Sequence, residues 1–183
     1  VDSINRGKVH IVEPDLDVLV KSAVNSGNLV AALQPGKADI FILAVPTPFA
    51  ENKQPDNRFV ESATCAICDV LEPGNLVILE STVPVGTTEN IVANTILEKR
   101  PELAGKLSIA HCPERVLPGQ ILRELIENDR VVGGIDQAST DIAADFYREF
   151  VSGEVLVTEA RTAEMAKLTE NSFRDVNIAF ANE

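Results

Sequence analysis

Short, unbroken apolar runs recur along the chain, and they constrain its fold more than any other feature of the sequence. The clearest two are ADIFILAV at 38–45 and LVIL at 76–79. A run without alternating polar residues is typical of a strand that is covered on both faces. The same reasoning predicts further strands at 107–112, 130–132 and 154–158.

Segments with helical spacing separate these runs. They lie at 16–26, 58–71, 87–100, 120–127 and 139–150. Because strands and helices alternate with short connections, the sequence predicts an α/β fold with a doubly wound, mostly parallel sheet. Gly133 and Gly134 follow the fourth run, but they do not form the G-x-G-x-x-G fingerprint of a dinucleotide site.

The closing stretch, 162–183, has no Gly and no Pro over 22 residues, and it predicts one long helix. Thr162 is its expected N-cap, with Glu164 in the first turn, where the helix dipole favours an anion. Apolar residues recur at helical spacing and form one stripe along this helix: Met165, Leu168, Phe173, Val176 and Phe180.

A polar face accompanies the stripe. Lys167, Asn171 and Asp175 follow one another at intervals of four residues, so they share one side of the helix. An amine, an amide and a carboxylate on one rigid face are suited to a functional site. The alternative is a solvated face with salt links such as Glu170 to Arg174, and the helix alone favours that alternative.

The charge balance bears on the kind of partner. With 28 acidic and 16 basic residues the net charge is −12, which argues against nucleic acid and against a polybasic membrane surface. It does not argue against an anionic small ligand, because helix N-termini can hold phosphate on an acidic protein. The sequence contains neither an 18-residue apolar run nor a signal-peptide pattern, so we expect a cytoplasmic protein.

Two of the three cysteines form a C-x-x-C pair. Cys65 and Cys68 lie inside a helical segment, without a second pair or a histidine nearby. Zinc sites with this spacing need further ligands. Small core residues are therefore the better interpretation, and we expect no metal site.

Three consecutive predicted strands end in distinctive loops. They read VPTP at 45–48, ESTVPVG at 80–86 and HCPER at 111–115. In open parallel sheets, ligands bind beyond the carboxyl ends of the strands. Each loop alone is ordinary turn chemistry, but three at one edge favour a nucleotide-type ligand.

Within these loops, some side chains could take part in chemistry. The Thr82 hydroxyl can donate and accept, although a bond to nearby backbone explains it equally well. Glu114 could act as a general base if partly desolvated, or it could be a capping or exposed acid. His111 and Cys112 end a buried run, and we expect both to be core residues.

The stretches VPTP, ESTVPVGTT, CPERVLPGQ with NDRVVGG, and TAEMAKLTENSFRDVNIAFANE together resemble the UDP-glucose/GDP-mannose dehydrogenase family. The resemblance covers essentially all 183 residues. This family oxidises the primary alcohol of a nucleotide sugar to a carboxylate in two steps, with two NAD per turnover and an enzyme thioester. The resemblance implies a Rossmann-like NAD-binding domain at 1–158 that lacks its first strand, turn and helix. It also implies that 159–183 begin a long central helix, which leads to a substrate and dimerisation domain.

The resemblance also assigns residues to the cofactor NAD. Val45, Pro46 and Thr47 would line the NAD site. Thr82 would contact the cofactor and help to orient a water molecule. The substrate would be a UDP-sugar, and the complete protein would be a homodimer.

The remaining roles implied by the resemblance concern the reaction. Glu114 would be the general base for thioester hydrolysis. Lys167 would stabilise the developing oxyanion and assist proton transfer, and Asn171 would hold the same oxygen or the water. With Arg115 and Val116, these two helix residues would also contact the substrate. An ammonium and an amide on a rigid helix stabilise charge with little reorganisation.

The sequence departs from the family pattern in ways that leave alternatives open. Pro118 stands where the UDP-glucose enzymes carry a second acidic residue, which favours an N-acetylated sugar; UDP-N-acetylglucosamine and UDP-glucose remain alternatives. By the resemblance, the chain starts after the Gly-rich turn and stops before the nucleophilic cysteine, which none of its three cysteines matches. A non-catalytic nucleotide-binding or assembly module is therefore the second hypothesis for the chain alone.

Overall fold

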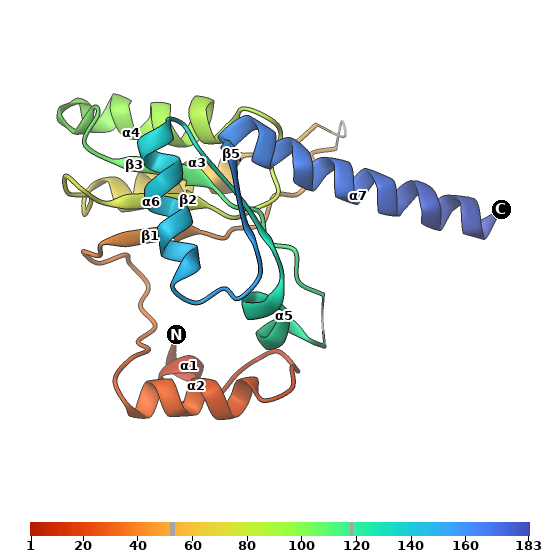
Figure 1. Ribbon diagram of the computed structural model, residues 1–183. Coiled ribbons are helices and arrows are strands. Elements are labelled where there is room, and N and C mark those ends of the chain that lie inside the picture. The colour runs from red at the N-terminus through yellow and green to blue at the C-terminus, as the bar shows by residue number, and fades with distance from the viewer. Residues whose placement is uncertain (52–53, 118) are drawn as a thin grey trace.

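Five strands form one sheet in the order of the sequence. The computed structural model describes residues 1–51, 54–117 and 119–183. The strands are β1 (Ile40–Leu43), β2 (Leu76–Leu79), β3 (Ser108–His111), β4 (Arg130–Gly134) and β5 (Val155–Glu159) (Figure 1). Among these described strands, only the β3–β4 pair is antiparallel. The predicted α/β fold with a mostly parallel sheet is confirmed.

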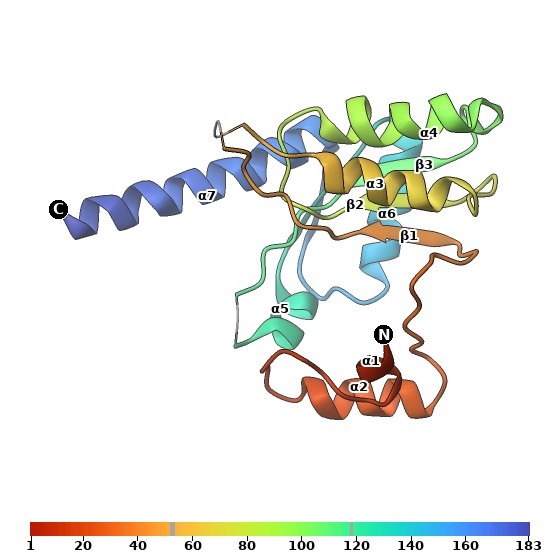
Figure 2. The same cartoon turned by 180° about the vertical axis from the view of Figure 1, so that it is seen from behind.

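Helices cover both faces of the sheet. On one face lie α3 (Arg58–Cys68), the π-helix η1 (Thr88–Ala93) and its continuation α4 (Asn94–Lys99); on the other lies α6 (Gln137–Arg148) (Figures 1 and 2). Connections between parallel strands are almost always right-handed. Because β4 and β5 run opposite to β1–β3 while the strand order continues in one direction, α6 must cross on the opposite face.

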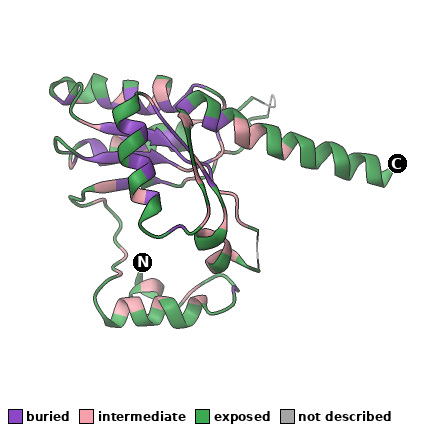
Figure 3. Ribbon diagram, viewed as in Figure 1, coloured by how far each residue is buried: buried purple, intermediate pink, exposed green. Residues whose placement is uncertain are grey.

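Each face has its own apolar core. Under α3, η1 and α4 the alternate side chains of β1–β3 are buried: Phe41, Leu43, Val77, Leu79 and Ile109. The other face packs Leu76, Ile78 and Val132 against Ala143 and Tyr147 of α6. All four residues of β2 are buried, as expected for a strand covered on both sides (Figure 3).

The N-terminal part lies apart from the sheet. Helices α1 (Asp2–Asn5) and α2 (Leu16–Asn25) contain no buried residue, and both lie well away from the strands in the two views (Figures 1 and 2). A buried acid, Glu13, ties this part to the rest, because its carboxylate accepts the N–H groups of Gly119 and Ile121 at 2.9 and 2.7 Å.

Strand β4 is offset along the sheet. Its glycines pair with the end of β3, Gly134 with Ala110 and Gly133 with His111. Continuing this register brings Arg130 level with Glu114, beyond the carboxyl ends of β1–β3. The sequence prediction that the two glycines follow the strand is wrong in detail, since both belong to it.

Helix α7 (Ala160–Asn182) starts earlier than the sequence suggested. Glu159 occupies the N-cap position, so the predicted N-cap Thr162 lies inside the helix. Strand β5 turns directly into α7 at the buried Ala160, and this junction packs onto β4. A β-carbon on Gly133 would lie 2.3 Å from the Glu159 carbonyl oxygen, so only glycine allows this approach. The second half of α7 projects away from the sheet (Figure 1).

Gly133→Ala should lower the free energy of unfolding by about 1–3 kcal/mol, because the new methyl group collides with backbone rather than with a movable side chain. Urea unfolding followed by circular dichroism measures the change. Gly36→Ala is the matched control, since a β-carbon there meets no atom within 4 Å. Equal stability of the two variants would contradict the close packing of β4 against the start of α7.

Candidate functional site

The loops after β1 and β2 are joined by hydrogen bonds. The Val45 N–H donates to the Ser81 hydroxyl oxygen at 2.8 Å, and this hydroxyl donates to the Val45 carbonyl at 2.8 Å. The Thr47 hydroxyl donates to the Thr82 carbonyl at 2.7 Å. The carbonyl of Thr82 is therefore engaged, whereas the contacts among the described residues include none for its hydroxyl. That hydroxyl stays available to a ligand.

A cavity of about 400 Å³ lies where these loops meet α7. Thr47, Thr82 and Asn171 line it, so the structure brings together three of the predicted site residues. Val45 and Pro46 precede Thr47 on the same loop. The other lining residues are mainly apolar: Phe49, Pro55, Asn57, Val83, Pro84 and Leu168. An apolar cavity with a few polar groups is typical of a small-molecule site.

The outer wall of this cavity was not predicted from the sequence. A hydrogen bond joins Asp56 to Pro48, with the Asp56 N–H donating to the Pro48 carbonyl at 2.9 Å. Next to these two residues, the exposed ring of Phe49 and the amide of Asn57 lie at the cavity. The buried Oδ1 of Asn57 has no hydrogen-bond partner within the described part of the chain, so it can accept one from a ligand. The aromatic residue directly after VPTP was the available signal.

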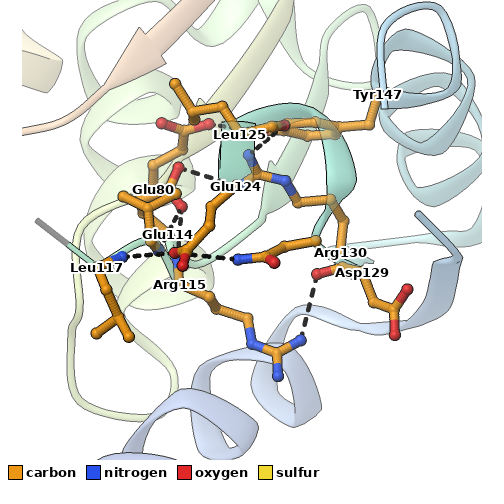
Figure 4. A network of polar contacts seen from close by, with 11 residues as sticks. Glu80, Glu114, Arg115, Leu117, Glu124, Leu125, Asp129, Arg130 and Tyr147 are labelled. Atoms are coloured by element: carbon orange, nitrogen blue, oxygen red, sulfur yellow. Dashed lines mark hydrogen bonds and ion pairs between the residues drawn. The ribbon is translucent and has the colours of Figure 1, made fainter. Parts of the chain in front are cut away.

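Both oxygens of the Glu114 carboxylate are held (Figure 4). Its Oε1 accepts the backbone N–H groups of Arg115 and Val116 at 2.6 and 3.0 Å. Its Oε2 accepts from Nη1 of Arg130 at 3.0 Å, and Arg130 is only 2% exposed. Sequence reasoning named Glu114 but missed Arg130, because strand register, not sequence spacing, brings the two together.

Arg115 contacts α7 instead of standing free. Its Nη2 lies 2.5 Å from Glu170 Oε1, and its Nε donates to Glu170 Oε2 at 3.2 Å. Its Nη1 donates to the Asp129 carbonyl at 3.2 Å. The salt link expected from Glu170 to Arg174 is replaced by this pair, and Arg174 donates to Asn171 at 3.0 Å.

Lys167 is half-buried on α7. Burial lowers the pKa of its amine, and the charges around it act in both directions: Glu170 and Glu114 raise this pKa, whereas Arg174 and Arg115 lower it. The amine therefore lies within electrostatic range of Glu114. No ion pair within 4 Å of it occurs among the residues that the structure describes. A partly desolvated, unpaired ammonium is suited to stabilising an oxyanion.

Glu164 fixes α7 in this position. Its buried carboxylate accepts the backbone N–H of Gly86 at 2.5 Å, the backbone N–H of Thr88 at 2.8 Å and the Thr88 hydroxyl at 2.7 Å. The sequence analysis placed Glu164 at the N-terminus of its own helix; it instead caps the N-terminus of η1. This contact sets where Asn171, further along α7, meets the loop after β2 at the cavity.

His111 and Cys112 are core residues, as predicted. Burial lowers the pKa of His111 to about 4 and raises the pKa of Cys112 to about 12. Both groups are therefore neutral at pH 7, and neither is poised for acid–base or nucleophilic chemistry. Of the C-x-x-C pair, Cys68 is buried and Cys65 half-buried.

Pro118, the position of the departure from the family pattern, lies outside the described residues. Within the described ranges, no cluster of His, Cys, Asp or Glu has the size and placement to bind a metal ion. In the same ranges no helix is both long and apolar enough to cross a membrane.

The fold and the strand-end cavity define a class, a Rossmann-like nucleotide-binding domain. Residues 1–151 match the model of the NAD binding domain of the UDP-glucose/GDP-mannose dehydrogenase family. This chain belongs to that family, and NAD is the cofactor of the domain.

Individual relatives agree with this assignment. The UDP-N-acetyl-D-mannosamine dehydrogenase of Campylobacter jejuni is 58% identical over the whole chain, which spans 47% of that relative's length. An NDP-N-acetyl-D-galactosaminuronic acid dehydrogenase of Ralstonia nicotianae is 55% identical, with 45% of its length covered. The solved UDP-N-acetyl-mannosamine dehydrogenase of Staphylococcus aureus matches with a TM-score of 0.90 at 41% identity, over 99% of this chain and 44% of that one. The chain thus spans a little under half the length of these relatives.

Glu164→Gln should lower the free energy of unfolding by about 1–3 kcal/mol, because the amide that replaces the carboxylate turns an NH₂ group toward N–H and O–H donors. Urea unfolding measures the loss. Glu61→Gln, an exposed change of the same kind on α3, should stay within about 0.5 kcal/mol of the parent. A Glu164 variant as stable as the Glu61 variant would show that this cap does not hold α7.

Proposed function

We propose that this chain is the NAD-binding portion of an enzyme that oxidises UDP-N-acetyl-D-mannosamine to its uronic acid, a precursor of surface polysaccharide. The observation that carries the proposal is that α7 brings Asn171 to the cavity beside Thr47 and Thr82. At the same edge of the sheet Arg130 holds Glu114, whose charge opposes the lowering of the Lys167 pKa by burial. Relatives of this name at 55–58% identity support the choice of sugar.

We also infer a division at residue 158 between the NAD domain and the central helix.

In the proposed reaction the primary alcohol loses two hydrides, one to each of two NAD⁺ molecules, one water supplies the second carboxylate oxygen, and three protons are released. After the second oxidation and before hydrolysis, the acyl group would be bound to a cysteine as a thioester. Cys68 and Cys112 are buried thiols of raised pKa. By the family resemblance none of the three cysteines, Cys65 included, matches the nucleophile, so we assign it to the part of the relatives that this chain does not cover.

The residues of the cavity fit the nicotinamide end of NAD. The apolar walls at Phe49 and Leu168 suit a flat ring, and the unpartnered Oδ1 of Asn57 and the hydroxyl of Thr82 suit a polar substituent. NAD, when bound, accepts hydride from the substrate. Thr47 would help to line the site, and Thr82 would also orient a water.

The helix and the Glu114 loop would act on the sugar side. The Lys167 ammonium and the Asn171 amide would stabilise negative charge on the reacting oxygen. Glu114, held on both carboxylate oxygens yet partly exposed, would take the proton of the hydrolytic water. Arg115 would orient α7 through its ion pair with Glu170. To contact the substrate as well, the Arg115 guanidinium group would have to give up one of its present hydrogen bonds.

Other N-acetylated sugars form the main alternative. The 55% identity to an enzyme named for N-acetyl-D-galactosaminuronic acid favours a galactosamine-derived substrate as the second candidate. UDP-N-acetylglucosamine and UDP-glucose complete the panel to be tested. For the 183-residue chain alone, we propose NAD binding without turnover.

We further propose a homodimer formed along α7. The apolar side chains of its second half are strongly exposed, with Phe173 at 72%, Val176 at 67% and Phe180 at 83%. A row of exposed apolar residues on one helix is typical of a protein interface. Leu168 of the predicted stripe instead lines the cavity.

The complete enzyme should produce two NADH per UDP-N-acetyl-D-mannosamine and less with the other sugars of the panel. Lys167→Ala should reduce kcat about 10²–10³-fold, because one oxyanion donor is lost. Absorbance at the NADH band measures both. Lys106→Ala removes an exposed charge of the same kind and should leave the rate unchanged. A Lys167→Ala variant whose kcat equals that of the parent enzyme would contradict the role of this amine.

Val176→Glu should convert the dimer of the complete protein into monomer, because a buried unpaired carboxylate costs several kcal/mol at a dry interface. Sedimentation velocity measures the mass. Asn182→Glu adds the same charge on another face of α7 and should leave the dimer intact. A dimer that survives Val176→Glu would place the interface elsewhere.

A further inference from the structure

We propose that Arg130 is the positioning residue of Glu114: it orients the carboxylate for the hydrolytic step. This inference rests on the proposed function, in which Glu114 takes the proton of the attacking water. Neither the sequence motifs nor the family resemblance assigned Arg130 a role. Two observations support this role: the contacts of the Arg130 guanidinium group (Figure 4) and the strand register that brings Arg130 to the site.

The offset of β4 explains how Arg130 reaches Glu114. The first residue of β4 lies beyond the carboxyl end of β3, level with the loop that carries Glu114. There its Nη1 donates to Glu114 Oε2 at 3.0 Å and its Nη2 donates to the Leu125 carbonyl at 3.1 Å. The two bonds engage both terminal nitrogens of the planar guanidinium group and so restrict its orientation.

A tyrosine from the opposite face of the sheet supports Arg130. The guanidinium carbon lies 5.6 Å from the ring centroid of Tyr147 on α6, within the range of a cation–π contact. The Tyr147 hydroxyl donates to Glu80 Oε1 at 2.6 Å. The backbone of Glu80 accepts the N–H of Glu114 at 3.4 Å. These contacts form a closed ring that runs from Glu114 through Arg130, Tyr147 and Glu80 back to Glu114.

The arrangement around Glu114 favours positioning over a purely structural role. Backbone N–H groups hold one carboxylate oxygen, so without Arg130 the other oxygen would be free to turn. The Glu114 side chain keeps 31% exposure, which leaves it open to water and substrate. Arg130 is buried with its Nε unpartnered among the described residues. Folding alone seldom requires a buried ion pair, since apolar residues in place of both partners are often neutral for stability, although removing one partner alone is costly.

The step that depends on this geometry is thioester hydrolysis. The water oxygen bonds to the acyl carbon, the carbon–sulfur bond breaks, the cysteine leaves as thiolate and Glu114 takes the water proton. Hydride transfer precedes this step and does not use Glu114 in the proposed scheme. A misplaced carboxylate therefore slows hydrolysis without slowing the earlier oxidation.

The test uses Arg130→Met in the complete enzyme, mixed with NAD and UDP-N-acetyl-D-mannosamine. The first burst of NADH should keep its rate, whereas steady-state turnover should fall roughly 10–100-fold, the scale expected for a misplaced group. Intact-mass measurement should show the acyl adduct accumulating on the enzyme. Arg130→Lys should recover part of the turnover, because lysine keeps the charge but not the fork; if Arg130→Met does not fold, this variant is measured in its place and should itself accumulate adduct.

Two controls separate positioning from loss of stability or charge. Val132→Ala opens a cavity on the same strand, and Arg123→Met removes an exposed cation that pairs with Glu127. Neither should accumulate adduct. If the Arg130 variant lowers burst and turnover equally, or accumulates no adduct, the positioning role is overturned.

Glu114→Gln distinguishes this failure from failure of the proposed function. It should accumulate adduct, and adding Arg130→Met to it should slow turnover no further, because both changes act on one group. Normal hydrolysis by Glu114→Gln would remove Glu114 from the mechanism and Arg130 with it. Impaired hydrolysis by Glu114→Gln beside normal hydrolysis by Arg130→Met would overturn only the role of Arg130.

Discussion

The buried carboxylate of Glu164 joins two segments that are 76–78 residues apart in the chain. It satisfies donors of Gly86 and Thr88 at the N-terminus of η1, where free N–H groups and the helix dipole favour an anion. The direction of α7 therefore follows from the place where the loop after β2 turns into a helix. Asn171 comes two turns further on, so its approach to the cavity depends on this one contact. Lys167 lies between Glu164 and Asn171 on the same helix.

The reversal of strand direction at β4 is the second constraint. It moves α6 to the other face and extends β4 past the carboxyl edge of β1–β3. Arg130 and Tyr147 reach the neighbourhood of Glu114 by this route. An all-parallel sheet would put the start of the fourth strand at the opposite edge, far from the loop. The mixed sheet is thus part of how the site is built.

Local sequence patterns predicted the elements, because burial of a run such as 76–79 depends on the run itself. The same holds for Thr82 and Glu114, which lie on loops that end recognisable strands. Contacts between distant segments had no such signal. Glu164 was assigned to its own helix terminus, because a cap supplied by another segment leaves the local pattern unchanged. Arg130 was read only as the beginning of a strand, since its partner depends on register.

Charge pairing explains why one cation of the site is available. The protein carries a net charge of −12, yet cations gather around Glu114. Arg130 is paired with Glu114, and Arg115 with Glu170, so each is neutralised in place. Among the described residues Lys167 has no such pair, and burial weakens its hold on its proton. An anion that forms beside α7 would therefore meet Lys167 without first breaking a salt bridge, whereas recruiting Arg115 would cost the contact that aligns the helix.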